Sequence, residues 1–327
     1  MELIANHNTS EMIQADVEIV NSKSNNFIEA NTTKVALSHL KNDCIIPVFS
    51  KDNESTISHF QFIDRTMEVA RSLFPNQRIA EPEIRVSHIV KGRIPSAIGK
   101  PAKELREEEK TIYYERCAFI IEFPEITQKI NNSLLKLTIG GVRSYGQQNL
   151  YSKKSLEKFK VFIGFNNMVC TNLCISTDGF SDDIKIGSII DLEDQINNLV
   201  SSYNQESHIE VLNNIARYSL TEEQFAHLIG KLRMYTSAPK TENNINFPIG
   251  LTDSQVTNVV RNYYNCPNFK RDADGSINLW NLYNLFTEAN KSSYIDSNLE
   301  RNVNAYGLIQ NLGNSLSSKT YNWFLHT

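Results

Sequence analysis

The stretch TIYYERCAFIIEFPEI, residues 111–126, decides the fold class. Its side chains alternate between two faces with a period of two residues, which predicts an extended strand. The same period recurs in four further segments, at 84–94, 134–145, 159–165 and 168–177. Because loops rather than helical patterns separate these segments, they predict an antiparallel sheet.

The pattern changes to a helical one after residue 191. Successive segments carry apolar residues three and four positions apart, and two of them open with a capping box, at 221–224 and 252–255. An earlier helix, predicted over 58–74, begins with the same device. Strands followed by a run of helices indicate an α+β protein.

We therefore expect an antiparallel sheet in the N-terminal half and an α-helical C-terminal half. The predicted boundaries are a disordered or mobile arm over 1–35, a sheet-bearing region over 36–190 and a helical region over 191–327. The last two are compatible with one integrated domain. Segment 42–50 is expected to be a short buried strand broken by a proline.

Composition predicts a globular protein. The chain has 327 residues, of which 40% are hydrophobic and 21% charged, as in ordinary folded proteins. No run approaches the roughly 18 apolar residues of a membrane span, and the N-terminus lacks the basic start and apolar block of a secretory signal. We therefore expect a cytoplasmic protein without a membrane partner, whose five cysteines remain thiols.

The net charge of −4 is unevenly distributed. Residues 84–160 contain 15 Lys or Arg and 8 Asp or Glu, whereas residues 191–327 contain 10 and 14. Two interpretations remain open at this point. The surplus of cations is either spread over ordinary solvated faces or forms a basic surface for an anionic partner such as nucleic acid.

A basic and aromatic segment carries the nucleic-acid hypothesis. Cations that contact phosphates, next to aromatic rings that stack on bases, are what single-strand binding requires. The alternative is a solvated basic edge whose tyrosines are anchored in the core. The candidate nucleic-acid-binding residues are Lys91, Arg93, Arg143, Tyr145, Tyr151, Lys153, Lys154, Lys158 and Lys160.

Cys170 and Cys174 could bind a metal, do chemistry or fill the core. On one strand they share a face but lie about 13 Å apart, at roughly 3.3 Å per residue. No histidine has zinc-ligand spacing to them. A nucleophilic Cys170 would need a distant histidine such as His88, His208 or His227. Because free cysteine is among the most buried residue types, packing is the favoured interpretation.

Two glycine-containing segments are weak candidates for ligand sites. FKRDADGSINLWN, residues 269–281, places Lys270 and Asn281 where a calcium-binding loop needs carboxylates, so a tight turn at Gly275 is the better interpretation. The Gly140–Gly141 pair lacks the spacing of a phosphate-binding loop and predicts a strand-ending turn or bulge. We predict no metal site and no cofactor.

Two motifs resemble a known family. MVCTNLCI, residues 168–175, is similar to the V-C-x-N strand of the phage/plasmid-like proteins (domain of unknown function 932). NLWNLYNLFTE, residues 278–288, resembles the W-x-x-x-N-x-x-T-E helix of that family through Trp280, Asn284, Thr287 and Glu288. The family's N-S-H-x-G turn is replaced here by NLYSKKS, so a role for its histidine does not transfer. Asn284 is predicted to pair with the Asn172 amide.

A narrower family is closer still. The segments at 87–105, 111–126 and 150–165 resemble an uncharacterised family (domain of unknown function 3871) carried on conjugative transposons and prophages, over about residues 35–320. Neither family provides an established activity. The resemblance implies a mobile-element setting, with nucleic-acid metabolism and interference with host defence as themes.

These observations lead to three hypotheses. The first is a non-enzymatic nucleic-acid-associated protein of a mobile element, such as a single-stranded DNA binding or annealing factor. The second is a protein-binding module that interferes with a host defence or replication factor. The third and least favoured is an enzyme of unknown type, since no set of nucleophile, base and orienting group can be named from the sequence.

Overall fold

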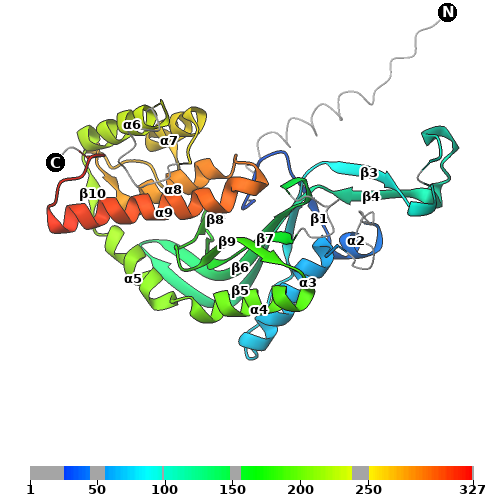
Figure 1. The fold of residues 1–327 in the computed structure, drawn as a ribbon. Helices are drawn as coiled ribbons and strands as arrows, with labels where there is room; N and C mark the ends of the chain where they lie inside the picture. Colours follow the sequence, from blue (N-terminus) through cyan, green and yellow to red (C-terminus); the bar gives the residue numbers. More distant parts are fainter. Residues whose placement is uncertain (1–25, 45–55, 98, 148–155, 238–249, 326–327) are drawn as a thin grey trace, which may run out of the picture.

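The computed structural model describes residues 26–44, 56–97, 99–147, 156–237 and 250–325. Its centre is a curled, seven-stranded antiparallel sheet, with two small two-stranded sheets beside it (Figure 1). The large sheet has the order β1 (Thr33–Val35), β2 (Glu83–Val86), β5 (Arg116–Ile130), β6 (Ser133–Ser144), β7 (Glu157–Asn167) and β8 (Asn172–Cys174), and β9 (Phe180–Ile186) also pairs with β7. The small sheets pair β3 (Ile89–Arg93) with β4 (Lys110–Tyr114) and β10 (Ser219–Leu220) with β11 (Ile277–Asn278).

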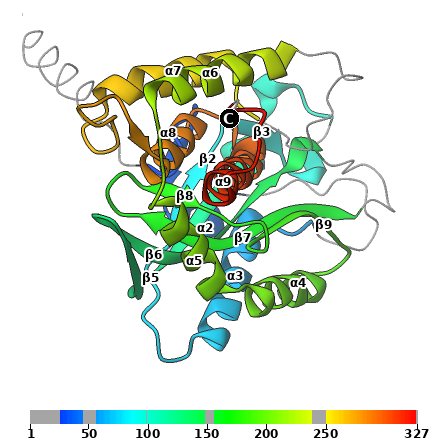
Figure 2. The same ribbon diagram turned by 90° about the vertical axis from the view of Figure 1, so that its left-hand side faces the viewer.

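Helices cover both faces of the large sheet (Figure 2). The sheet is contacted by α3 (His59–Leu73), α4 (Ile189–Ser202), α5 (Gln205–Ile215), α8 (Leu279–Asn290) and α9 (Ile295–Ser318). Helix α7 (Asp253–Asn265) packs against α8 and α6 (Glu222–Ser237) against α7, and the short α2 (Leu37–Asn42) lies near β4. No helix within the described ranges combines the length and apolar character needed to cross a bilayer.

The first half of β5, residues 117–123, is buried on both sides, which explains why apolar residues occupy both of its alternating faces there. The Phe119 ring meets the Phe62 ring of α3 edge-on, with centroids 5.0 Å apart. Ile120, one position further, faces the opposite way and packs in a second cluster with Ile295 and Leu299 of α9. The sheet therefore forms the middle layer of a three-layer body.

The predicted α+β class is confirmed, with the sheet in the N-terminal part and most helices in the C-terminal part. The predicted helix starts are also confirmed. The capping boxes at Ser58, Thr221 and Thr252 all form in the structure, each with a glutamine three residues later.

Two expectations for the start of the chain need correction. Residues 26–35 do not form a mobile arm, because Phe27 and Ile28 are buried in the cluster with α9 and β1 joins the sheet. The strand predicted over 42–50 is not seen in its described part. Helix α2 runs to Asn42, and Cys44 makes only an isolated bridge to Ile112; residues 45–50 lie outside the described residues.

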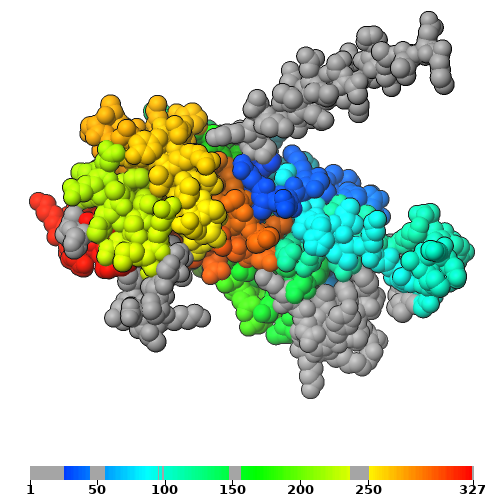
Figure 3. Space-filling view, turned by 90° about the horizontal axis from the view of Figure 1, so that it is seen from above, coloured from blue at the N-terminus to red at the C-terminus, as the bar shows by residue number. Residues whose placement is uncertain are grey.

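The segment 84–94 was predicted as one strand but divides into β2 and β3. The backbone bends at residues 87 and 88, and β4 separates from β5 at the opposite position. The resulting β3–β4 hairpin, with its connecting turns, forms an arm (residues 88–115) that projects from the body (Figures 1 and 3).

The Gly140–Gly141 pair lies inside β6 and does not end it, contrary to the prediction. A side chain at Gly140 would collide with the Phe119 carbonyl oxygen and approach the Phe162 ring to 2.7 Å. The strand continues because only glycine lets the neighbouring strand and the aromatic rings come this close.

We expect Gly140→Ala to destabilise the protein by about 1–3 kcal/mol, since backbone atoms cannot yield to the added methyl group. The matched control is Gly230→Ala on α6, where an added side chain has nothing within 4 Å. The control should stabilise by about 0.5–1 kcal/mol, because alanine favours the helix. Urea unfolding measures both values. Equal stability of the two variants would show that β6 is not tightly packed at this position.

Candidate functional site

The two family-like motifs meet in space around the amide of Asn284 in α8. Its Oδ1 accepts hydrogen bonds from Nδ2 of Asn167 at 2.8 Å and of Asn172 at 3.3 Å, and from the Cys170 thiol at 3.7 Å. Its own Nδ2 donates to the Trp280 carbonyl at 2.9 Å. The predicted pairing of Asn284 with Asn172 is confirmed.

Lys291 fixes the turn between β7 and β8 to the end of α8. Its side chain is only 3% exposed. The ammonium donates to the Cys170 carbonyl and, at 3.2 Å, to the Thr171 hydroxyl, and it pairs with Glu288 at 3.0 Å. Thr171 adopts a left-handed backbone conformation with φ of 56°. We call the groups around Asn284 and Lys291 the asparagine clamp, since they hold the sheet edge against α8.

Cys170 lies in this clamp as a thiol. Burial raises the pKa of Cys170 to about 12, and the nearby Lys291 ammonium opposes that shift only in part. A thiol with such a pKa is not a nucleophile at neutral pH. Its hydrogen bonds within the described residues do not involve a histidine. Cys174 is fully buried, and the described residues contain no group of three or more His, Cys, Asp and Glu placed to hold a metal ion.

Two of the nine candidate nucleic-acid residues, Arg143 and Tyr145, lie in the core. The Arg143 guanidinium has no exposed surface; it pairs with the Glu157 carboxylate and donates to the Ile57 carbonyl. It also lies over the rings of Tyr145 and Phe159, 4.5 and 4.4 Å from their centroids. Neither residue is available to a partner at the surface, which corrects their assignment to a binding surface.

The same cluster keeps a histidine neutral. His59 lies against the Tyr145 ring, with centroids 4.4 Å apart, and its Nε2 bonds the Tyr114 carbonyl at 2.8 Å. Burial lowers the pKa of His59 to about 3, and the neighbouring Arg143 charge contributes. The imidazole is therefore an uncharged packing group at neutral pH.

Lys158 and Lys160 lie on β7, but the neighbouring strand β9 supplies carboxylates to both. Lys158 pairs with Asp183 at 3.3 Å and Lys160 with Asp182 at 2.9 Å. Asp183 also pairs with Lys185, which lowers the pKa of its carboxyl group. The predicted residues Tyr151, Lys153 and Lys154 lie outside the described residues.

Lys91 and Arg93 lie on β3 in the arm. The tip of the arm consists of three 3₁₀ turns at Pro95–Ala97, Ala102–Glu104 and Glu107–Glu109. The buried Glu109 carboxylate orders them: it accepts from Lys100 Nζ at 2.5 Å and from the Arg106 backbone N–H at 3.0 Å. These bonds lower the pKa of Glu109 to about 2.

Sequence analysis missed a cluster at the base of the arm. His39 Nδ1 bonds Asp43 at 2.7 Å, while its Nε2 lies 3.0 Å from the Tyr114 hydroxyl and 3.9 Å from Cys44 Sγ. The four-residue spacing of His39 on α2 and Asp43, which directly follows that helix, was the available signal. Burial, with a smaller effect of Asp43, raises the pKa of Cys44 to about 11. The thiol is thus protonated at neutral pH, and the cluster attaches α2 to β4.

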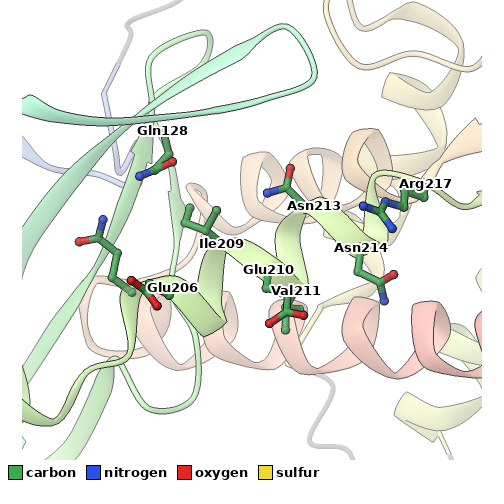
Figure 4. Close-up of a pocket in the computed structure, with 9 residues that line it drawn as sticks. Gln128, Glu206, Ile209, Glu210, Val211, Asn213, Asn214 and Arg217 are labelled. Atoms are coloured by element: carbon green, nitrogen blue, oxygen red, sulfur yellow. The ribbon is translucent and has the colours of Figure 1, made fainter.

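A groove of about 610 Å³ runs along α5 (Figure 4). Its lining includes Glu206, Glu210 and Asn213 of α5, and Arg217 just after that helix. Gln128 of β5 lies across the groove from them. None of these side chains is a buried polar group left without a partner in the described part of the chain. The groove is consequently an ordinary solvated helix face.

The comparison with protein families gives one match. A family described as "Domain of unknown function, B. Theta Gene description (DUF3871)" matches residues 8–325. The chain belongs to this family. The matched range includes the asparagine clamp, the arm and all nine candidate residues. No curated protein matches the chain. No solved structure matches it either.

Arg143→Met should destabilise the protein by about 3–5 kcal/mol, because it leaves the Glu157 carboxylate buried without its cation. Adding Glu157→Gln should recover part of that loss. Lys158→Met on the same strand is the matched control and should change stability by about 0–1 kcal/mol, since its ion pair is exposed. Guanidinium chloride unfolding measures all three. Similar effects of Arg143→Met and Lys158→Met would contradict the buried role of Arg143.

Proposed function

We propose that the protein is a non-enzymatic nucleic-acid-associated protein of a mobile genetic element, which contacts single-stranded DNA through the arm. The observation that carries this proposal is the arm itself, a two-stranded ribbon that projects from the body (Figure 3) and whose sequence includes six Lys or Arg. The likeness of MVCTNLCI to the phage/plasmid-like family supports the mobile-element setting.

The arm offers few but accessible cations. Lys91 and Lys103 are exposed, and neither forms an ion pair with another described residue. Over residues 88–115 the arm has six Lys or Arg against five Glu. Because only cations free to meet phosphates release counterions, we expect about two or three phosphate contacts and a shallow salt dependence.

The cations of β7 contribute less to this proposal. The side chains of Lys158 and Lys160 are 42% and 18% exposed. A phosphate would have to replace the carboxylates of Asp183 and Asp182, which already neutralise them. The arm is therefore the primary contact, and β7 is at most an extension of it.

Fluorescence anisotropy with a labelled oligo-dT tests the proposal. With two or three phosphate contacts, log K should fall against log salt with a slope of about −1.4 to −2.1. The double variant Lys91→Gln/Lys103→Gln should abolish most of this slope. Lys129→Gln, an exposed cation at the other end of β5, is the control and should bind as the parent protein does. Absence of binding at low salt would rule the proposal out.

The second candidate is a protein-binding module that interferes with a host defence or replication factor. The specific observation in its favour is β3, whose pairing in the described residues is with β4 alone. The outer edge of a two-stranded ribbon presents backbone groups that can pair with a strand of another protein. The near balance of charge on the arm also suits a protein partner.

Affinity capture from nuclease-treated host lysate distinguishes this candidate. A strand-pairing partner should be retained by the parent protein and lost with Ile89→Lys, since a lysine on an edge strand opposes strand addition. Ile89 is 47% exposed, so the substitution leaves the core intact. Leu134→Lys, a similarly exposed strand position at 44%, is the control. Equal capture by both variants would exclude β3 as the contact.

A further inference from the structure

A second groove, of about 610 Å³, lies over the large sheet beside the asparagine clamp. Its walls come from four places in the chain: residues 34–37 of β1 and α2, residues 80–83 before and in β2, β5, and the end of β7 with the turn that follows it. All of them belong to the described residues.

More carboxylates than cations line this groove. Glu81, Glu83 and Glu122 line it, against one lining cation, Lys34. Lys136 from β6 lies 3.5 Å from Glu122 and offsets part of that charge. Burial raises the pKa of Glu83; Lys34, Arg85 and Lys291 oppose this effect, and Glu122 adds to it.

Two oxygen atoms in the groove lack partners. The Oε1 atom of Glu83 and the Oδ1 atom of Asn166 are buried, and neither has a hydrogen bond to any described residue. The amide orientation of Asn166 follows from its surroundings, because its Nδ2 donates to Glu122 at 2.7 Å and only a donor can face that carboxylate. Asn166 is 2% exposed. Unsatisfied buried acceptors are rare and call for an explanation.

A cation rich in donors would satisfy these groups and also meet the lining carboxylates. A carboxylate and an amide oxygen are acceptors only, whereas an ammonium has three N–H donors and a guanidinium five. A metal ion fits poorly. The described residues contain no group of three or more His, Cys, Asp or Glu side chains that could hold a metal ion. Leu37, Ile120 and Met168 provide an apolar wall for the methylene stem of such a ligand.

We propose that this groove binds an organic ammonium or guanidinium group. The group belongs either to a free polyamine or to a Lys or Arg side chain of a partner, which the groove recognises by the same chemistry. The carboxylates of Glu83 and Glu122 meet the charge, and the Asn166 carbonyl accepts one further N–H. This site is independent of the arm and of DNA binding.

Isothermal titration calorimetry with the full chain at low salt tests the site. The probes are spermidine and the blocked peptide acetyl-Gly-Arg-Gly-amide, with the neutral citrulline isostere of the peptide as control. We expect spermidine or the arginine peptide to bind with a Kd below about 1 mM. Binding of spermidine alone identifies a polyamine source, and binding of the peptide alone a protein side chain. Binding of neither, or equal binding of the citrulline peptide, overturns the proposal.

Glu83→Gln should raise the Kd at least about tenfold, because it replaces a charge-assisted hydrogen bond by a neutral one. Glu206→Gln in the groove along α5 is the matched control and should leave the Kd within about twofold. Since burial disfavours the charged form of Glu83, the glutamine variant should melt no lower than the parent protein. Glu81→Gln, at an exposed position of the same groove, gives a second variant with a smaller expected increase. An unchanged Kd in both groove variants would refute the site.

Discussion

The asparagine clamp is the constraint on which the rest of the structure depends. It joins the β7–β8 turn of the sheet to α8 of the helical layer through Asn284 and Lys291. Each buried amide or ammonium left without its partner would cost about 1–3 kcal/mol or more. The clamp also reaches the start of the chain, because the backbone N–H groups of Glu29 and Ala30 donate to the Lys291 carbonyl. Three segments distant in sequence are thus fixed together, and the motif residues are explained by structure before any activity is invoked.

Charge is the second organising feature of the molecule. Within the described part of 84–160, acidic residues from outside that segment meet several of the surplus cations across the fold. Arg116 pairs with Asp296 of α9 at 2.8 Å, and Lys160 lies near Asp182 of β9 and Glu300 of α9. The opposite charges of the two halves therefore partly neutralise each other where the halves pack together. The arm keeps the exposed cations Lys91 and Lys103, and the groove beside the clamp keeps the exposed carboxylate of Glu81.

The sequence predicted what depends on local periodicity. Periods of two and of three to four residues identified the sheet and the helices, and capping boxes located helix starts, since both signals lie within a few residues. The Asn172–Asn284 pair could also be predicted, because a polar residue inside an apolar helix needs a partner. Arg143 could not be placed, since charge favours the surface and its partner Glu157 follows on the next strand. The prediction for the Gly140–Gly141 pair was wrong for a similar reason. Only the neighbouring strand and the aromatic rings show why a side chain is excluded there.

Burial keeps several cysteine and histidine side chains of the described residues in their neutral forms. Catalysis at neutral pH needs an accessible group whose pKa has been moved toward the working pH. Here burial moves the pKa values the other way: Cys44 and Cys170 are held as thiols, and the pKa of His208 falls to about 4. These three side chains are thereby kept in their neutral forms, which suits packing and hydrogen bonding. The recognition of charged partners that we propose uses other groups, the exposed cations Lys91 and Lys103 of the arm and the carboxylates of the groove beside the clamp.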